Sequence, residues 1–194
     1  MIYIVSGFMR TGTSMMMQAL VAGGLEAAYS NEREKLNDIL GDKLYKPNSG
    51  GFFEVAVEEY NEIGFPLKYQ DKLIKVMSWA LNSIAVNDAG YRIILMRRNA
   101  EEIRQSCDAA LEKKLKGFNE KEYCSRMDDL EKRMRNRKDV ISFTSFWYRD
   151  VIENAVETMQ VLKDLGWPIN VIEAVNAIDP SKYRFRLENL VVGI

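Results

Sequence analysis

Short apolar runs, separated by longer amphipathic stretches, divide this chain of 194 residues. Residues 2–6, 73–77 and 91–96 are mostly apolar and β-branched, a pattern that is typical of strands buried on both faces of a sheet. Two weaker runs, at 25–29 and 140–143, are further candidate strands. Because strands of this kind are covered on both sides, the pattern predicts a sheet that lies between layers of helices.

Helical patterns lie between and after these runs. Residues 13–21 carry helix-forming side chains and end before two glycines, while 100–138 has the apolar spacing of amphipathic helices with a break near Gly117. Residues 151–165 and 169–178 predict two more helices. Strand and helix alternate as in βαβ units, so we expect one three-layer α/β/α domain with a central parallel sheet over the whole chain.

Composition and charge exclude several classes of function. The chain has 27 basic and 28 acidic side chains and a net charge of −1, so nothing global attracts it to nucleic acid or to an anionic membrane. It lacks histidine, which removes histidine-based triads and zinc sites, and its two cysteines do not have metal-binding spacing. No apolar run reaches the ~20 residues that span a bilayer, and no signal peptide is evident, so we expect a cytoplasmic protein.

A glycine-containing loop follows the first predicted strand and opens the first predicted helix. Residues 7–14 have the form G-x-x-x-x-G-T-S, which matches a phosphate-binding P-loop except that Thr13 replaces the lysine of nucleoside triphosphatases. Neither of the next two strong strands ends in the aspartate that holds magnesium in those enzymes. The pattern therefore predicts an anion site without a metal, in which Arg10 supplies the positive charge; the alternative is an ordinary glycine-containing turn.

Two features together make the chain resemble the sulfotransferase family. Residues 9–14, Met-Arg-Thr-Gly-Thr-Ser, are similar to the loop of that family that binds the phosphosulfate group, with Met9 and Thr11 as mild departures. Arg98 and Ser106 have the separation of the family's pair on the 3′-phosphate of the adenosine cofactor. This separation is about two helical turns, which returns both side chains to one face.

Three other segments, NSGGFFE, LIKVMS and DPSKYRFR, resemble segments of small prokaryotic members of the family, so the likeness covers most of the chain. The resemblance implies a P-loop fold and the transfer of a sulfuryl group from 3′-phosphoadenosine 5′-phosphosulfate (PAPS), without a metal, to a hydroxyl or amine of a small-molecule or saccharide acceptor. It implies that the cofactor-binding residues are Gly7, Met9, Arg10, Thr11, Gly12, Thr13, Ser14, Arg98, Ser106 and Arg184. The catalytic residues that it implies are Arg10, Glu54 as the base, and Lys75.

Each of these assignments has a structural alternative. Glu54 stands at a predicted helix start, where the helix dipole favours an acid without any catalytic role. Lys75 is equally explained as a lysine that extends to solvent from a sheet edge, and Arg184 as a member of a surface ion pair. Arg97 and Arg104 are interpreted as surface charges in the same way.

Two other functions compete with sulfuryl transfer. A P-loop nucleoside or nucleotide kinase predicts magnesium-dependent turnover of ATP, and a non-catalytic nucleotide-binding protein of the same fold predicts binding without transfer. Some aromatic side chains either line an acceptor pocket or belong to the core. They are Phe52, Phe53, Phe65, Trp79 and Trp147.

Overall fold

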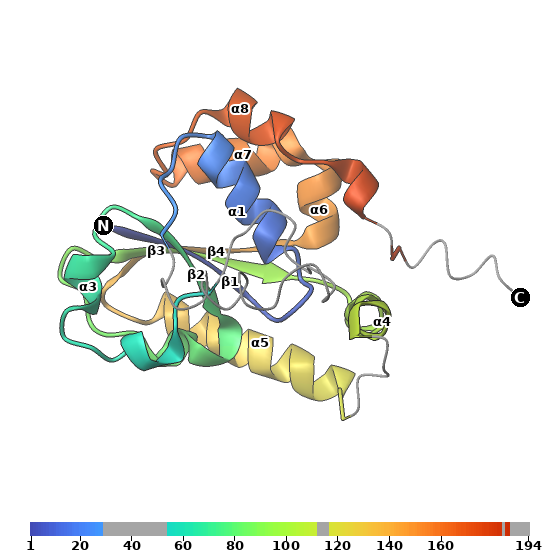
Figure 1. The fold of residues 1–194 in the computed structure, drawn as a ribbon, viewed down its shortest axis with the longest axis horizontal. Coiled ribbons are helices and arrows are strands. Elements are labelled where there is room, and N and C mark those ends of the chain that lie inside the picture. Colours follow the sequence, from blue (N-terminus) through green and yellow to red (C-terminus); the bar gives the residue numbers. More distant parts are fainter. Residues whose placement is uncertain (29–53, 112–116, 184, 187–194) are drawn as a thin grey trace, which may run out of the picture.

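A parallel sheet of four strands, in the order β2-β1-β3-β4, forms the centre of the part of the chain that the structure describes (Figure 1). The structure is a computed structural model and describes residues 1–28, 54–111, 117–183 and 185–186. The strands are β1 (Ile2–Gly7), β2 (Leu73–Met77), β3 (Tyr91–Arg97) and β4 (Val140–Trp147). The three strong apolar runs are therefore confirmed as neighbouring parallel strands.

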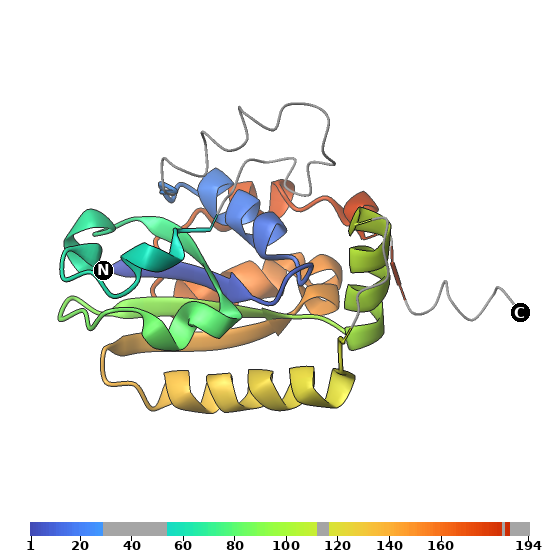
Figure 2. The ribbon, with the colours of Figure 1, turned by 60° about the horizontal axis from the view of Figure 1, so that its bottom comes forward.

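Helices cover both faces of the sheet and complete a three-layer α/β/α fold (Figure 1, Figure 2). One face carries α1 (Thr13–Ala22), α6 (Tyr148–Glu153), α7 (Ala155–Asp164) and α8 (Val171–Asn176). The other carries α3 (Phe65–Lys68), α5 (Glu120–Arg135) and the 3-10 helix η3 (Ser78–Ser83). Helix α4 (Ala100–Leu111) stands where the strands end, and two more 3-10 helices are η2 (Val57–Glu59) and η4 (Pro180–Lys182).

The strands place alternate side chains in two separate cores. Ile4 and Ile93 belong to the core on the side of α5, whereas Val5 and Ile94 belong to the core on the side of α1 and α7. This burial on both faces is the physical reason why the sequence of each central strand is an unbroken apolar run. Among the helices of the described ranges, none combines the length and apolarity needed to cross a membrane.

The strand order of the sheet reverses between β1 and β3. Strand β1 pairs with β2 on one side and with β3 on the other. The chain after β1 enters α1 on one face of the sheet, and the chain after β3 reaches α5 on the other face. In open parallel α/β sheets, ligands bind at this switch point, outside the carboxyl ends of the strands. The loop 8–12 after β1 and Arg98 after β3 both lie there.

Two weaker strand predictions differ from the structure. The run 140–143 continues as β4 to Trp147, because a strand with only one neighbour in the sheet accepts the polar side chains that end the apolar run. In the described part of the run 25–29, which is residues 25–28, Ala27 forms a single parallel bridge with Leu73 and no strand is present.

The helix predictions are correct in position but differ at their ends. The break near Gly117 is confirmed, since α5 begins only after Asn119, whose side chain accepts a hydrogen bond from a first-turn amide. The single helix predicted over 151–165 is instead α6 and α7, because Asn154 has a non-helical conformation between them (φ −127°, ψ 48°). The helix predicted over 169–178 is shorter, since the side chain of Asn170 caps α8.

Candidate functional site

The loop that connects β1 to α1 turns through unusual backbone conformations. Arg10 and Gly12 have φ angles of 64° and 93°, in the left-handed region. A Cβ at Gly12 would lie 2.2 Å from Cδ2 of Tyr148, and a Cβ at Gly7 would lie 2.4 Å from Oγ1 of Thr11. Both glycines of the G-x-x-x-x-G pattern are therefore required by close approach, and Gly12 also by its backbone conformation.

The N-terminus of α1 has the properties of an anion site. The first hydrogen bond inside the helix runs from the Met16 N–H to the Gly12 carbonyl oxygen (3.1 Å), so the amides of 13–15 have no carbonyl acceptor within α1. No side chain caps this end, and the first turn contains no acidic residue. Because the helix dipole makes this end positive, the residues present fit a phosphate or sulfate group.

Hydrogen bonds connect Arg10, Ser106 and Arg98 across the switch point. Arg10 Nε donates to Ser106 Oγ (3.0 Å), and Arg98 Nη1 donates to the Arg10 carbonyl oxygen (3.1 Å). Ser106 and Arg98 are both buried. The structure thus brings together residues that the sequence singled out in two distant motifs, and their binding role stays a prediction.

The guanidinium group of Arg98 is held on several sides. Its Nε donates to Oε2 of Glu102 (2.9 Å), and its Nη2 donates to the carbonyl oxygen of Phe185 (3.2 Å). The rings of Tyr148 and Tyr183 lie 4.7 and 5.3 Å from its central carbon. The Tyr183 hydroxyl donates to the other oxygen of Glu102 (2.8 Å), and burial together with this hydrogen bond raises the pKa of the Tyr183 phenol. Glu102 was not among the predicted site residues. Its spacing of four residues from Arg98 was an available signal for an ion pair, which here joins a residue just before α4 to the first turn of the helix.

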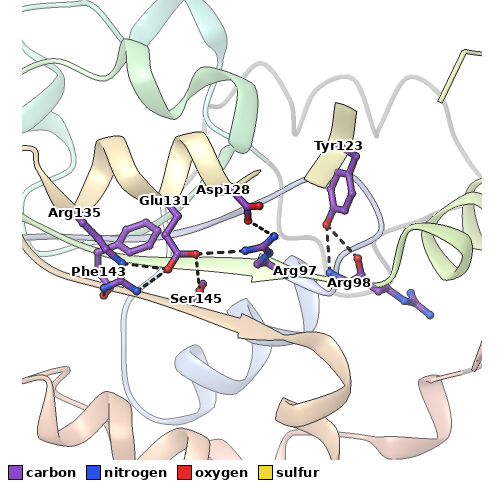
Figure 3. A network of polar contacts seen from close by, with 8 residues as sticks. All are labelled: Arg97, Arg98, Tyr123, Asp128, Glu131, Arg135, Phe143 and Ser145. Atoms are coloured by element: carbon purple, nitrogen blue, oxygen red, sulfur yellow. Dashed lines mark hydrogen bonds and ion pairs between the residues drawn. The ribbon is translucent and has the colours of Figure 1, made fainter. Parts of the chain in front are cut away.

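Arg97 and Arg98 are consecutive but have different surroundings (Figure 3). Arg97 Nη2 bonds to Oδ1 of Asp128 (2.7 Å) and its Nη1 lies 3.5 Å from Oε2 of Glu131, both on α5. The backbone of Arg98 bonds to the Tyr123 hydroxyl, which accepts from its N–H (3.4 Å) and donates to its carbonyl oxygen (3.2 Å), while the side chain extends away from α5. Arg97 is therefore an ion-pair partner of α5, and Arg98 is the arginine that reaches the loop.

Lys75 and Glu54 form an ion pair beside the start of α1. Lys75 Nζ lies 3.0 Å from Oε1 of Glu54 and donates to Ser14 Oγ (3.3 Å). The Lys75 side chain is 3% exposed, so the alternative of a lysine that extends to solvent is wrong. Glu54 does not stand at a helix start either: it forms a single β-bridge with Lys75, and η2 begins only at Val57. Pairing with Lys75, and not a helix dipole, accounts for its position.

The other predicted binding residues lie around the loop in different ways. Thr13 is buried, whereas Met9 is exposed. The Thr11 hydroxyl donates to the carbonyl oxygen of Phe8 (2.7 Å) and thereby braces the loop itself. Arg184 lies outside the described residues. Within the described ranges, no group of three or more metal-ligating side chains is arranged to hold an ion.

The aromatic residues considered for an acceptor pocket have separate locations. Phe65 is buried in the core, which confirms the alternative interpretation for this residue. Trp147 lies against the guanidinium of Arg97, 5.0 Å from ring centre to central carbon. Trp79 is 59% exposed and lines a cavity. Residues 52–53 lie outside the described residues.

Comparison with known proteins identifies a similar fold but no matching sequence family. No protein-family model matches the chain, and no curated protein matches it significantly. Among solved structures, the sulfotransferase STF1 of Mycobacterium tuberculosis H37Rv is 16% identical with a TM-score of 0.51, and the alignment covers 98% of this chain and 73% of that one. This likeness establishes a shared fold: the protein has a three-layer α/β/α fold like that of this sulfotransferase.

Two further structures are more distant. A sugar kinase from Janibacter sp. HTCC2649 is 14% identical with a TM-score of 0.45, over 84% of this chain and 94% of that one. Retinol dehydratase in complex with androsterone and the inactive cofactor PAP is 11% identical with a TM-score of 0.41, over 94% of this chain and 64% of that one.

Proposed function

We propose that the protein is a sulfotransferase that moves a sulfuryl group from PAPS to a hydroxyl or amine acceptor without a metal ion. The observation that carries the proposal is the hydrogen-bonded connection from Arg98 through Arg10 to Ser106. A nucleotide phosphorylated at both ends needs two anion sites at one edge of the sheet. The uncapped N-terminus of α1 supplies the first, and Arg98 with Ser106 supplies the second.

The first anion site would hold the 5′-phosphosulfate. The backbone of Gly7, Met9, Thr11 and Gly12 shapes the loop, and the first-turn amides of α1 with the hydroxyls of Thr13 and Ser14 are the donors. A helix terminus that lacks both a capping side chain and an acidic residue is well suited to this charge.

The second anion site would hold the 3′-phosphate. Ser106 Oγ accepts a hydrogen bond from Arg10, so its own O–H can be donated to a phosphate oxygen. Arg98 is oriented by Glu102 and by two tyrosine rings, which fixes its guanidinium before any ligand arrives. Arg184, the remaining predicted binding residue, belongs to the proposal through the family resemblance alone.

The bound donor would supply an activated sulfuryl group, and the chain would supply position and charge. Glu54 would take the proton of the acceptor hydroxyl or amine as the new bond to sulfur forms and the bond from sulfur to the 5′-phosphate oxygen breaks. Arg10 and Lys75 would stabilise the negative charge left on that oxygen. Lys75 lies between Glu54 and Ser14, so its ammonium group could move from the carboxylate towards the leaving oxygen. A carboxylate that loses its ammonium partner accepts a proton more readily.

Calorimetric titration with 3′-phosphoadenosine 5′-phosphate (PAP) and with 5′-AMP tests the two-site arrangement. We expect PAP to bind at least tenfold more tightly than 5′-AMP, and Ser106→Ala to remove most of this difference, since a hydrogen bond to a charged group is worth about 1.5–3 kcal/mol. Arg104→Ala is the matched control, because Arg104 lies on the same helix, is 45% exposed, and pairs with Glu101 as a surface charge.

A transfer assay separates the proposal from its two alternatives. Transfer of labelled sulfate from PAPS in the presence of a chelator is the expected result. Equal affinity for PAP and 5′-AMP, together with magnesium-dependent turnover of ATP, would favour a nucleoside or nucleotide kinase. PAP binding with no transfer to any acceptor, and no change in Glu54→Gln, would favour a non-catalytic nucleotide-binding protein.

A further inference from the structure

The two edges of the sheet are covered in different ways. At the edge formed by β2, the Leu73 N–H donates to the carbonyl oxygen of Glu26 (2.8 Å), and the Ala28 N–H donates to that of Leu73 (2.9 Å). The Val55 N–H donates to the carbonyl oxygen of Lys75 at the same edge (3.0 Å). At the opposite edge, β4 pairs with β3 alone within the described ranges. Strand β4 is therefore the edge at which a further strand can join the sheet.

Strand β4 lacks several features that usually prevent pairing at a sheet edge. With eight residues it is the longest strand of the described sheet, and it contains no charged side chain and no proline. Trp147, its last residue, is 43% exposed. Edge strands are commonly short, or are interrupted by charges or proline, because an unprotected edge pairs readily with another strand.

A bulge limits the part of β4 that can pair. Tyr91 is level with Val140 and Arg92 with Ser142, so Ile141 is an extra residue without a partner on β3. From Ser142 to the end of the strand the register with β3 is regular. We therefore expect a further strand to pair only beyond the bulge.

Alternate residues of this regular part direct their backbone groups towards the open edge. The Tyr91 N–H donates to the Asp139 carbonyl oxygen (2.7 Å), so the odd-numbered residues of β3 direct their backbone groups towards β4. In a parallel ladder, each such residue bonds to the two residues on either side of the one level with it, whose own N–H and C=O then point outward. The outward-facing residues of β4 are Phe143, Ser145 and Trp147.

Side chains of α5 contact this edge without closing it (Figure 3). Arg135 Nη1 donates to the Phe143 carbonyl oxygen over 3.4 Å, while its Nε and Nη2 bond to Oε1 of Glu131 at 3.1 and 2.7 Å. A carbonyl oxygen has two lone pairs, so that of Phe143 can accept a second hydrogen bond. The Ser145 hydroxyl donates to Oε2 of Glu131 (2.9 Å), which does not involve the backbone of Ser145.

The segment 143–147 is complementary to itself in an antiparallel pair. When Ser145 lies opposite Ser145 of a second copy, Phe143 lies opposite Trp147 at both ends of the pair. This register sets outward-facing residues opposite one another, so all of them can form hydrogen-bonded pairs about a two-fold axis. It also pairs two aromatic side chains across the strands twice and covers the exposed Trp147.

We propose that the protein forms a dimer in which the β4 strands of two copies pair antiparallel about Ser145 and join two sheets into one. A second copy is the partner that this register selects, because the order aromatic, x, serine, x, aromatic is the same from either end and no charge has to be matched. The inference is independent of the proposed function. Pairing uses the open edge of the described sheet, so assembly stops at two copies.

Oxidative cross-linking of Ser145→Cys tests the register. Opposite Cα atoms in a hydrogen-bonded antiparallel pair are about 5.5 Å apart, within the ~4.4–6.8 Å that a disulfide spans, so a linked dimer is expected on a non-reducing gel. Ser142→Cys is the matched control, because both serines are half-buried on β4. Its two copies would lie about 20 Å apart, six residues along the strands, and should not link. The wild-type chain shows the background from Cys107 and Cys124.

Sedimentation velocity measures the dimer without a cross-link. Five residues a side are few beside the roughly 20–30 of a standard interface, so we expect a reversible dimer that forms as the concentration rises. Ser145→Lys sets like charges opposite each other and should raise the dissociation constant at least tenfold. Val156→Lys, at a residue on α7 that is 62% exposed, should leave it unchanged. A mixture of Ser145→Lys and Ser145→Glu should dimerise again, because opposite charges then meet at the axis.

Three results would overturn the proposal. The first is a wild-type chain that stays monomeric up to submillimolar concentration, which would leave the edge to another partner or to none. The second is an assembly larger than a dimer, and the third is equal linking of Ser142→Cys and Ser145→Cys. The cysteine variants change one atom of the side chain, so the test holds even if Ser145→Lys does not fold.

Discussion

The Lys75 ammonium group lies 3.0 Å from Oε1 of Glu54, and the two partners differ in exposure, with 3% of the Lys75 side chain exposed against 21% for Glu54. This difference decides which partner the fold can lose more easily. A charge left behind in a buried position is poorly solvated, whereas a partly exposed carboxylate can be hydrated.

We therefore expect Glu54→Leu to destabilise the protein more than Lys75→Met. The first variant leaves a buried ammonium group without this carboxylate, and the second leaves Glu54 in contact with water. The free energies of unfolding should differ by about 1–2 kcal/mol, measured by urea unfolding at neutral pH. Glu54→Gln retains an oxygen acceptor for Lys75 and should lie between the two. A larger loss from Lys75→Met would contradict this account of the pair.

Gly12→Ala is expected to destabilise the protein more than Gly24→Ala. Both glycines have positive φ angles, 93° and 107°, so alanine is strained at either by about 1 kcal/mol. A Cβ at Gly24 meets nothing within 4 Å, whereas one at Gly12 would lie 2.2 Å from the Tyr148 ring, a clash that adds about 1–3 kcal/mol. Urea unfolding measures both losses. If the clash is the cause, Gly12→Ala should lose less in a Tyr148→Ala background, and an unchanged loss there would refute it.

The central sheet and the loop could be predicted from sequence because their causes are local. Strands that are buried on both faces leave unbroken apolar runs, and the tight turn after β1 requires glycine at Gly7 and Gly12. The closeness of Arg98 and Ser106 also has a local cause, because α4 begins at Ala100, two residues after Arg98, and carries Ser106. The pairing of Arg98 with Glu102 has the same local origin and was available from the sequence, although it was not used.

The remaining features depend on contacts between distant segments. Glu54 was expected at a helix start, but the backbone and ammonium group of Lys75 hold it in a bridge beside β2. The residue that leaves no room for a side chain at Gly12 is Tyr148, which lies on α6 and is distant from Gly12 in the sequence. The cavity that Trp79 lines, between η3 and α5, combines side chains from three segments, and no single stretch contains a signal for it.

Tyr91→Phe is expected to reduce the loss of stability at alkaline pH. Burial raises the pKa of the fully buried Tyr91 phenol, although the nearby Arg137 guanidinium opposes the shift. The folded state therefore keeps this proton at a pH where the unfolded chain, with a pKa of about 10, has lost it. The contribution is complete below about pH 10 and falls as the pH rises, by up to about 1.4 kcal/mol per pH unit.

Urea unfolding between about pH 9 and about pH 11 measures this slope, which should be shallower in Tyr91→Phe. The comparison is clean because the Ala85 carbonyl oxygen accepts the Tyr91 hydroxyl (2.8 Å) and also Nη2 of Arg137 (2.9 Å), so it stays bonded in the variant. The loss at neutral pH should therefore remain below about 1 kcal/mol. An unchanged alkaline slope would mean that Tyr91 loses its proton at the same pH in the folded and the unfolded state, and would contradict the raised pKa.

Arg10→Gly is expected to separate stability from anion binding. Arg10 has a φ of 64°, a conformation that disfavours an L-residue by about 1–2 kcal/mol and glycine hardly at all. Loss of the hydrogen bond from Nε to Ser106 Oγ offsets this gain by about 1 kcal/mol, so the free energy of unfolding should change by less than about 1 kcal/mol. Affinity for PAP should fall at least tenfold, because a charged donor is removed from between the two anion sites.

Asp71→Gly is the matched control for this variant. Asp71 is the other non-glycine residue with positive φ in the part of the chain that the structure describes, at 59°. It pairs with the N-terminal amine just before β2, at the end of the sheet opposite to the loop 8–12. Urea unfolding should show a small change for both variants, and calorimetry should show loss of PAP affinity for Arg10→Gly alone. A loss of several kcal/mol in Arg10→Gly would instead mean that Arg10 holds the loop in shape, so that any fall in PAP affinity follows from a collapsed loop and not from a missing charge.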